Sequence, residues 1–134
     1  MELRHINIGL LIFRLNFGVL MLFHGVHKLL HGVDGIKGML PELGLPAILA
    51  YGVHVGETIA PILLIIGFRT RLAALVFTFV MVVAFVMAHT ENIFSLAKSG
   101  SWAAELVALY LFGGLGIYFT GGGKYVVSTT NKWD

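Results

Sequence analysis

The stretch LAALVFTFVMVVAFVMA, residues 72–88, decides the class of the fold because it is apolar and carries no charged residue. A run of this length is close to the roughly 20 residues that an α-helix needs to cross about 30 Å of hydrocarbon. Three further apolar segments of similar length lie at residues 6–30, 45–68 and 102–120. The sequence therefore predicts an all-α integral membrane protein: a four-helix transmembrane bundle that takes up residues 1–134 as a single domain.

Composition supports this class and excludes several others. Apolar residues make up 57% of the chain and the mean hydropathy is +0.89, well above what the surface of a soluble protein tolerates. A soluble helical bundle would need a polar face on each helix, and no segment has one. The net charge of +2 comes without a basic cluster, so we expect no nucleic-acid partner. The chain has no cysteine, which excludes iron–sulfur and thiol redox chemistry and leaves any redox role to a bound cofactor.

The distribution of Lys and Arg around the spans indicates an orientation. Both termini are expected to be cytoplasmic, with the two longer loops outside, because Lys and Arg gather on the cytoplasmic side of membrane proteins. Five such residues fall on the terminal side and three on the other: Arg4, Arg69, Arg71, Lys124 and Lys132 against Lys28, Lys37 and Lys98. The first of the longer loops, residues 31–46, is long enough for a short amphipathic helix.

Charged residues inside the spans are costly and commonly face the bundle interior, where they pair with one another or line a site. Arg14 and Glu57 are each about 12 Å from the cytoplasmic face if the helices rise 1.5 Å per residue through a 30 Å layer. An Arg14 to Glu57 ion pair is therefore one prediction, with either a structural or a ligand-contacting role. Arg14 shares a helical stripe with Gly18, Gly25 and Gly32, which indicates a helix contact face.

A second polar group gathers at the outer ends of the spans. Its members are His24, His27, His31 and Lys28 on the first span, His89 on the third and Glu105 on the fourth. Histidines one turn apart with a carboxylate could bind zinc or iron, and histidines from different spans could ligate haem. The alternative is that they are interfacial histidines, which hydrogen-bond to headgroups and water.

His54 lies deeper, about 13 Å below the outer surface. Glu57 or Glu105 could be its partner, and a chain of histidine and carboxylate is the form of a proton relay or an anchor for a quinone carbonyl. A hydrogen-bonded structural histidine is the alternative.

In order and spacing, these residues resemble the DoxX family of small bacterial membrane proteins. The resemblance includes Arg14, the HGVHKLL stretch at residues 24–30, Glu57, GFRTRLAAL at residues 67–75 and the final FTGGGKY at residues 119–125. It implies a four-helix bundle in the bacterial inner membrane. It also implies a link to oxidoreductase systems, since relatives include the DoxD-type subunit of thiosulfate:quinone oxidoreductases. The family pattern carries over onto Arg14, Lys28 and Glu57, and the histidines are an elaboration on it.

Three functions remain open from the sequence. The first is a component of a membrane oxidoreductase system that binds quinone, or another small redox ligand, in a pocket between spans one, two and four. The residues expected to contact the ligand are Arg14, His24, Lys28, His54, Glu57 and Glu105, with haem or metal at His24, His27 and His54 as the weaker variant. The second is a non-catalytic assembly or chaperone-like subunit, and the third is a small-solute transporter. Whether the chain is itself an enzyme stays open. Its expected partners are the lipid bilayer and an oxidoreductase subunit, and a homo-oligomer is left open.

Overall fold

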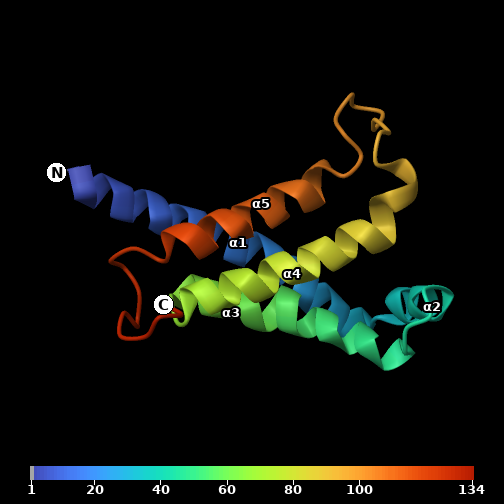
Figure 1. Ribbon diagram of the computed structural model, residues 1–134, viewed down its shortest axis with the longest axis horizontal. Coiled ribbons are helices and arrows are strands. Elements are labelled where there is room, and N and C mark those ends of the chain that lie inside the picture. The colour runs from blue at the N-terminus through green and yellow to red at the C-terminus, as the bar shows by residue number, and fades with distance from the viewer. Residues whose placement is uncertain (1) are drawn as a thin grey trace.

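The computed structural model describes residues 2–134, and within them the chain is helical with no β-strand beyond one isolated bridge (Figure 1). The helices are α1 (Glu2–His31), α2 (Asp34–Glu42), η1 (Ala47–Gly52), η2 (Val55–Ile59), α3 (Ala60–Ile66), α4 (Thr70–His89), η3 (Thr90–Asn92) and α5 (Glu105–Thr120). The predicted all-α class is confirmed.

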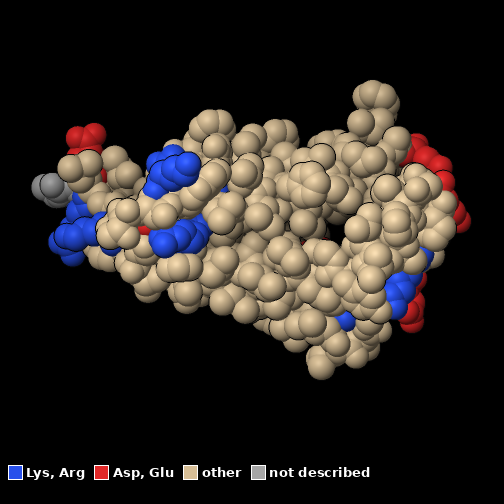
Figure 2. All heavy atoms as spheres, turned by 60° about the horizontal axis from the view of Figure 1, so that its bottom comes forward, with Lys and Arg blue, Asp and Glu red and all other residues tan. Residues whose placement is uncertain are grey.

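Three helical stretches are long and apolar enough to cross a membrane: residues 2–31, 47–66 and 70–92. The fourth apolar helix, α5, is shorter, at 16 residues. Large apolar side chains, among them Phe13, Phe23, Phe79 and Phe112, are exposed along the helices. Figure 2 shows this uncharged surface between two charged ends. Such a surface suits contact with hydrocarbon, and the protein is a membrane protein.

Helices α1, α3, α4 and α5 lie side by side, with α4 packed on α5 and on α3, and α1 packed on α3 and α5 (Figure 1). Both termini and the turn between α3 and α4 lie at one end, which we call the tail end. The opposite end, the loop end, carries α2 and the segment of residues 90–104. The short helix expected in the first loop is thus α2.

The second apolar segment is not the single regular helix that the sequence predicts for residues 45–68. It starts as the 3-10 helix η1, passes through the π-helix η2 and becomes α-helical only at Ala60. Pro61 explains the interruption, because it has no N–H to donate to the carbonyl of Glu57 four residues earlier. A π-helical turn accommodates this loss by widening the helix, and such turns are frequent at functional sites.

Glycines set how closely the helices approach. A Cβ atom at Gly18 would lie 2.7 Å from the Ile65 side chain, and one at Gly25 would overlap the carbonyl oxygen of Glu57. Gly18, Gly25 and Arg14 are all buried, so the predicted contact stripe on α1 is confirmed for these three. Gly32 differs because it is exposed and ends the helix with a φ of +84°.

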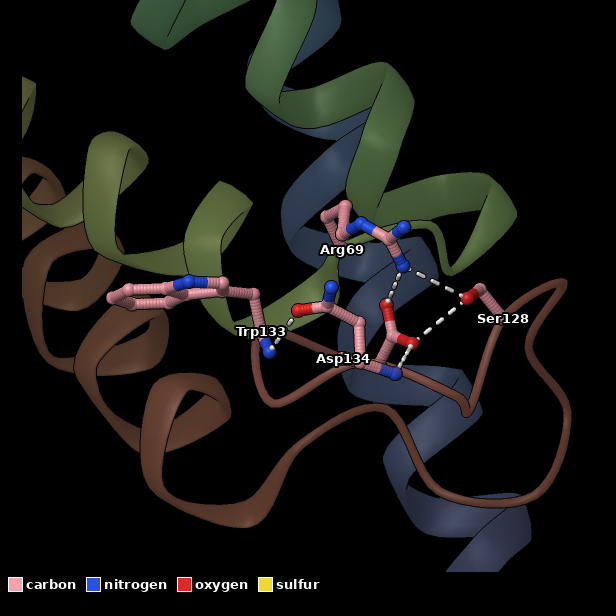
Figure 3. A network of polar contacts seen from close by, with 5 residues as sticks. Arg69, Ser128, Trp133 and Asp134 are labelled. Atoms are coloured by element: carbon pink, nitrogen blue, oxygen red, sulfur yellow. Dashed lines mark hydrogen bonds and ion pairs between the residues drawn. The ribbon is translucent and has the colours of Figure 1, made fainter.

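The segment after α5 folds back over the tail end (Figure 3). Arg69 donates a hydrogen bond to the Ser128 hydroxyl and forms a 2.9 Å ion pair with Asp134. Desolvation alone would raise the pKa of Asp134. The hydrogen bonds from Ser128, Arg69 and the Asn131 N–H, with the charge of Arg69, instead hold that pKa at about 2. The segment is therefore held on the bundle by a carboxylate that stays ionised at neutral pH.

Candidate functional site

A buried ion pair joins the first two apolar segments near the loop end. The ammonium nitrogen of Lys28, in the last turn of α1, lies 2.5 Å from Oε2 of Glu57 in η2. The Glu57 side chain is 6% exposed and that of Lys28 is 27% exposed. Burying a carboxylate this completely is costly unless a cation accompanies it, and Lys28 supplies that cation.

The local backbone brings these two side chains together. Gly25, one turn before Lys28, lets α1 approach the backbone of Glu57 and the Thr58 hydroxyl. Gly56 does the same on the other side of η2, where a Cβ would overlap the Val80 side chain of α4. The π-helical turn is thus held between α1 and α4, and this fixes the direction of the Glu57 carboxylate.

The ion pair faces a cavity of about 610 Å³ enclosed by α1, α2, η1, η2 and α4. Lys28 and Glu57 are the only charged side chains among the residues that line it. The other lining residues are Ile36, Met39, Leu40, Leu45, Leu49, Ala50, Gly52, Val53, Phe79, Val80, Val83, Ala84, Met87 and Ala88. The cavity is therefore apolar except at one buried acid–base pair. Its volume falls in the range of about 300–1,000 Å³ that is typical of small-molecule sites.

The cavity opens toward the outside of the bundle at its apolar rim. Leu45 and Leu49 on one side, and Phe79 and Val83 on the other, line the cavity and are also exposed. Exposed apolar side chains suit contact with lipid, so the composition of this rim is suited to the hydrocarbon layer.

Arg14 does not pair with Glu57, and that prediction is wrong. Its guanidinium is fully buried near the middle of α1, on the tail side of Lys28, where it donates to the carbonyl oxygens of Leu64, at 3.0 Å, and Tyr125. The error is in the depth estimate, which counted Arg14 from the start of the first apolar segment and Glu57 from the start of the second, and joined the two counts through a layer of about 30 Å. With 30 residues, α1 is about 45 Å long and begins at Glu2, so the two counts do not share a common reference.

The three other predicted ligand contacts lie away from the cavity lining. His24 is exposed on α1, with its ring centroid 6.1 Å from that of Tyr110, and Glu105 is exposed at the start of α5. His54 is half-buried, its ring 6.3 Å from that of Tyr51, and its buried Nδ1 has no hydrogen-bond partner. The predicted roles of His24, His54 and Glu105 in ligand binding stay predictions.

The histidines do not assemble into a metal-binding group within the part of the chain that the structure describes. His27 and His31 stack with ring centroids 4.3 Å apart, but no three His, Asp or Glu side chains of residues 2–134 come together in a metal-binding arrangement.

The prediction also missed most of the cavity wall. The walls come from α1, α2, η1, η2 and α4, whereas α5, which the sequence predicts as the fourth span, contributes no lining residue. The signal that could have shown this is the apolar spacing of Ile36, Met39 and Leu40 in the first loop, which is typical of an amphipathic helix.

Known proteins resemble this chain in sequence. The chain is similar to a protein of Bacillus subtilis (strain 168) named "Putative oxidoreductase CatD", with 29% identity over 80 residues. The match covers 60% of this chain and 59% of that protein, less than two thirds of its length. No solved structure matches the chain. The model of the DoxX family matches residues 9–90, which is more than half of the sequence and includes both Lys28 and Glu57. This protein therefore belongs to the DoxX family.

Proposed function

We propose that the protein is a component of an oxidoreductase system of the bacterial inner membrane and that its cavity binds a quinone or another small, lipid-soluble redox ligand. The observation that carries this proposal is a single buried Lys28–Glu57 pair in an otherwise apolar cavity. Most small-molecule sites have this composition: apolar walls with a few polar groups that fix the orientation of the ligand.

The chemistry of the pair fits the two redox states of a quinone. The Lys28 ammonium can donate a hydrogen bond to a quinone carbonyl, and the Glu57 carboxylate can accept one from a quinol hydroxyl. A quinone that is reduced to a quinol takes up two electrons and two protons. Glu57, held in place by Lys28, is suited to hold or pass on one of those protons.

The rim supports a ligand that comes from the bilayer. A quinone carries an apolar tail, and the exposed side chains of Leu49 and Phe79 offer that tail an apolar path between η1 and α4. A water-soluble ligand would have to pass the same apolar surface without hydrogen-bond partners, which is costly.

The electrons would come from elsewhere, because the chain has no cysteine and hence no thiol or iron–sulfur chemistry of its own. We propose a partner subunit as their source, in line with the name of the similar Bacillus subtilis protein. With the termini cytoplasmic, as the Lys and Arg distribution favours, the cavity would lie in the outer half of the membrane.

Binding of a short-chain quinone, ubiquinone-1, to the detergent-purified chain tests this proposal by calorimetry. Glu57→Gln should weaken binding roughly tenfold to a hundredfold, because a hydrogen bond to a charged group contributes about 1.5–3 kcal/mol. Glu91→Gln is the matched control, since Glu91 is exposed in η3 at the same end of the molecule, and it should bind like the wild type. Circular dichroism of each variant separates a lost ligand contact from a lost fold.

A wild-type chain that does not bind ubiquinone-1, or equal binding by wild type and Glu57→Gln, would contradict the proposal. A non-catalytic assembly role would then be favoured. Its support is Arg14, whose buried guanidinium holds α1, α3 and the tail together through backbone carbonyls, with no need for a ligand.

A further inference from the structure

The charges of the protein are divided unequally between its two ends (Figure 2). The tail end carries six Lys and Arg against two acidic residues: Arg4, Arg14, Arg69, Arg71, Lys124 and Lys132 against Glu2 and Asp134. The loop end carries three lysines against five acidic residues: Lys28, Lys37 and Lys98 against Asp34, Glu42, Glu57, Glu91 and Glu105. The tail end is thus the basic end of the molecule.

Two of the tail-end arginines already have partners. Arg69 is paired with Asp134, and Arg14 is buried on backbone carbonyls. Arg71 is different. Its guanidinium donates one hydrogen bond, of 3.3 Å, to the Tyr118 carbonyl, and within residues 2–134 it has no carboxylate partner. A guanidinium has five N–H groups, so most of its donors remain available.

These donors face a second cavity, of about 390 Å³, between the start of α4 and the segment after α5. Its lining residues include the charged side chains of Arg71, Lys132 and Asp134, the Ser128 hydroxyl and Gly121. Gly121 leaves room for the guanidinium, because a Cβ at that position would lie only 3.2 Å from Nη2 of Arg71. The absence of a side chain at Gly121 thus leaves space beside the Arg71 guanidinium.

Asp134 also lines this cavity, but both oxygens of its side-chain carboxylate already accept hydrogen bonds. Oδ1 accepts from Arg69, and Oδ2 accepts from the Ser128 hydroxyl and the Asn131 N–H. The side-chain charge of Asp134 is therefore balanced by Arg69, which leaves Arg71 and Lys132 as the two charged side chains of the lining that form no ion pair within residues 2–134. A cavity with this balance favours an anion.

We propose that this cavity binds the phosphate group of an anionic phospholipid from the adjoining leaflet. Arg71 would hold two phosphate oxygens at once, a geometry that suits a guanidinium, and Lys132 would add a second positive charge. The neighbours of the cavity support a lipid over a free anion. Leu72 follows Arg71, Phe119 precedes Thr120, and both side chains are large, apolar and exposed, so acyl chains can pack beside the headgroup.

The test is lipid binding by the full chain in detergent, followed by native mass spectrometry with phosphatidylglycerol and phosphatidylcholine of identical acyl chains. The wild type should retain phosphatidylglycerol about tenfold better. Arg71→Gln should remove most of that preference, and Lys132→Gln should weaken it several-fold without touching the Tyr118 contact. Lys98→Gln, an exposed lysine at the loop end, is the control and should retain the full preference.

Equal retention of the two lipids by the wild type would overturn the proposal. So would the same loss in Lys98→Gln as in Lys132→Gln, because that result would show only the effect of net charge. Displacement of phosphatidylglycerol by millimolar inorganic phosphate, but not by chloride of the same ionic strength, would assign the cavity to a free oxyanion and overturn the lipid assignment. None of these outcomes bears on quinone binding at the other end of the molecule.

Discussion

Replacing both members of the Lys28–Glu57 pair with apolar residues should destabilise the protein less than replacing Lys28 alone. The variants are Lys28→Met, Glu57→Leu and the double variant. Lys28→Met leaves a carboxylate that is 6% exposed without its cation. Breaking a buried pair in this way costs about 3–5 kcal/mol.

The other two variants should be milder. Glu57→Leu leaves a lysine whose side chain is 27% exposed and can turn its ammonium outward, so we expect a loss below about 3 kcal/mol. The double variant buries no lone charge and should lie within about 1 kcal/mol of the wild type, because apolar replacements of a buried pair are often neutral. The two substitutions should therefore couple by at least about 2 kcal/mol.

The assay is reversible unfolding in mixed micelles with increasing SDS, followed by circular dichroism. The exposed pair of Asp34 and Lys37 in α2, 3.9 Å apart, is the matched control. Asp34→Leu, Lys37→Met and their combination should couple by less than about 1 kcal/mol, as exposed ion pairs do. A Lys28–Glu57 double variant as unstable as Lys28→Met, or two single variants as stable as the wild type, would refute the reasoning.

Three further predictions concern the packing and the tail. Gly25→Ala should destabilise the protein by about 1–3 kcal/mol and weaken ligand binding, because its Cβ would overlap the adjacent π-helix; calorimetry and SDS unfolding measure the two effects. Arg14→Met should cost about 2 kcal/mol or more in the same unfolding assay, because it leaves two carbonyl groups without their donor. Lowering the pH from about 4 to about 2 should release the tail, because it protonates Asp134, whose pKa is depressed to about 2 in the folded protein. The stabilising effect of the Asp134 carboxylate is present above the unfolded pKa of about 3.9. That effect is lost as the pH falls through the folded value. The fluorescence of Trp133, the tryptophan in the segment after α5, reports this release.

Each of these predictions has a control in the same chain. Gly9→Ala changes a glycine of the same helix with open space around it and should leave both measurements unchanged. Arg4→Met removes an exposed arginine of α1 and should change stability by less than about 0.5 kcal/mol. Asp134→Asn should remove the fluorescence change between pH 4 and pH 2. If a control variant changes the measured stability, binding or fluorescence as much as the variant it is paired with, the reasoning behind that prediction is wrong.

The membrane class could be predicted from the sequence because it depends on composition and segment length alone. The stretch at residues 72–88 carries no charge and is apolar except for one threonine, and it lies within α4 (Thr70–His89). The contact stripe of Gly18 and Gly25 was also predictable, since the 100° step of an α-helix fixes which residues share a face. Both inferences concern a single regular helix.

The ion pair could not be predicted because it depends on how two helices are placed against each other. The register that the structure shows sets Arg14 beside Leu64 and Lys28 beside Glu57. The partner of Arg14 is thus about two turns beyond the predicted one, and the partner of Glu57 about four turns beyond the predicted one. The irregular start of the second segment adds to the difference, since 3-10 and π turns rise and rotate by other amounts than an α-helix. The Tyr125 carbonyl, which completes the environment of Arg14, comes from a segment without any helical period.

The most direct test of the central claim is the quinone content of the protein purified from its native membrane in a mild detergent. Liquid chromatography with mass spectrometry should find quinone near one per chain in the wild type, enriched over the bulk lipid extract. It should find quinone at the level of that extract in the double variant Lys28→Met/Glu57→Leu, whose fold is expected to be intact. Wild-type protein without quinone, or equal quinone in the wild type and the folded double variant, would contradict the account.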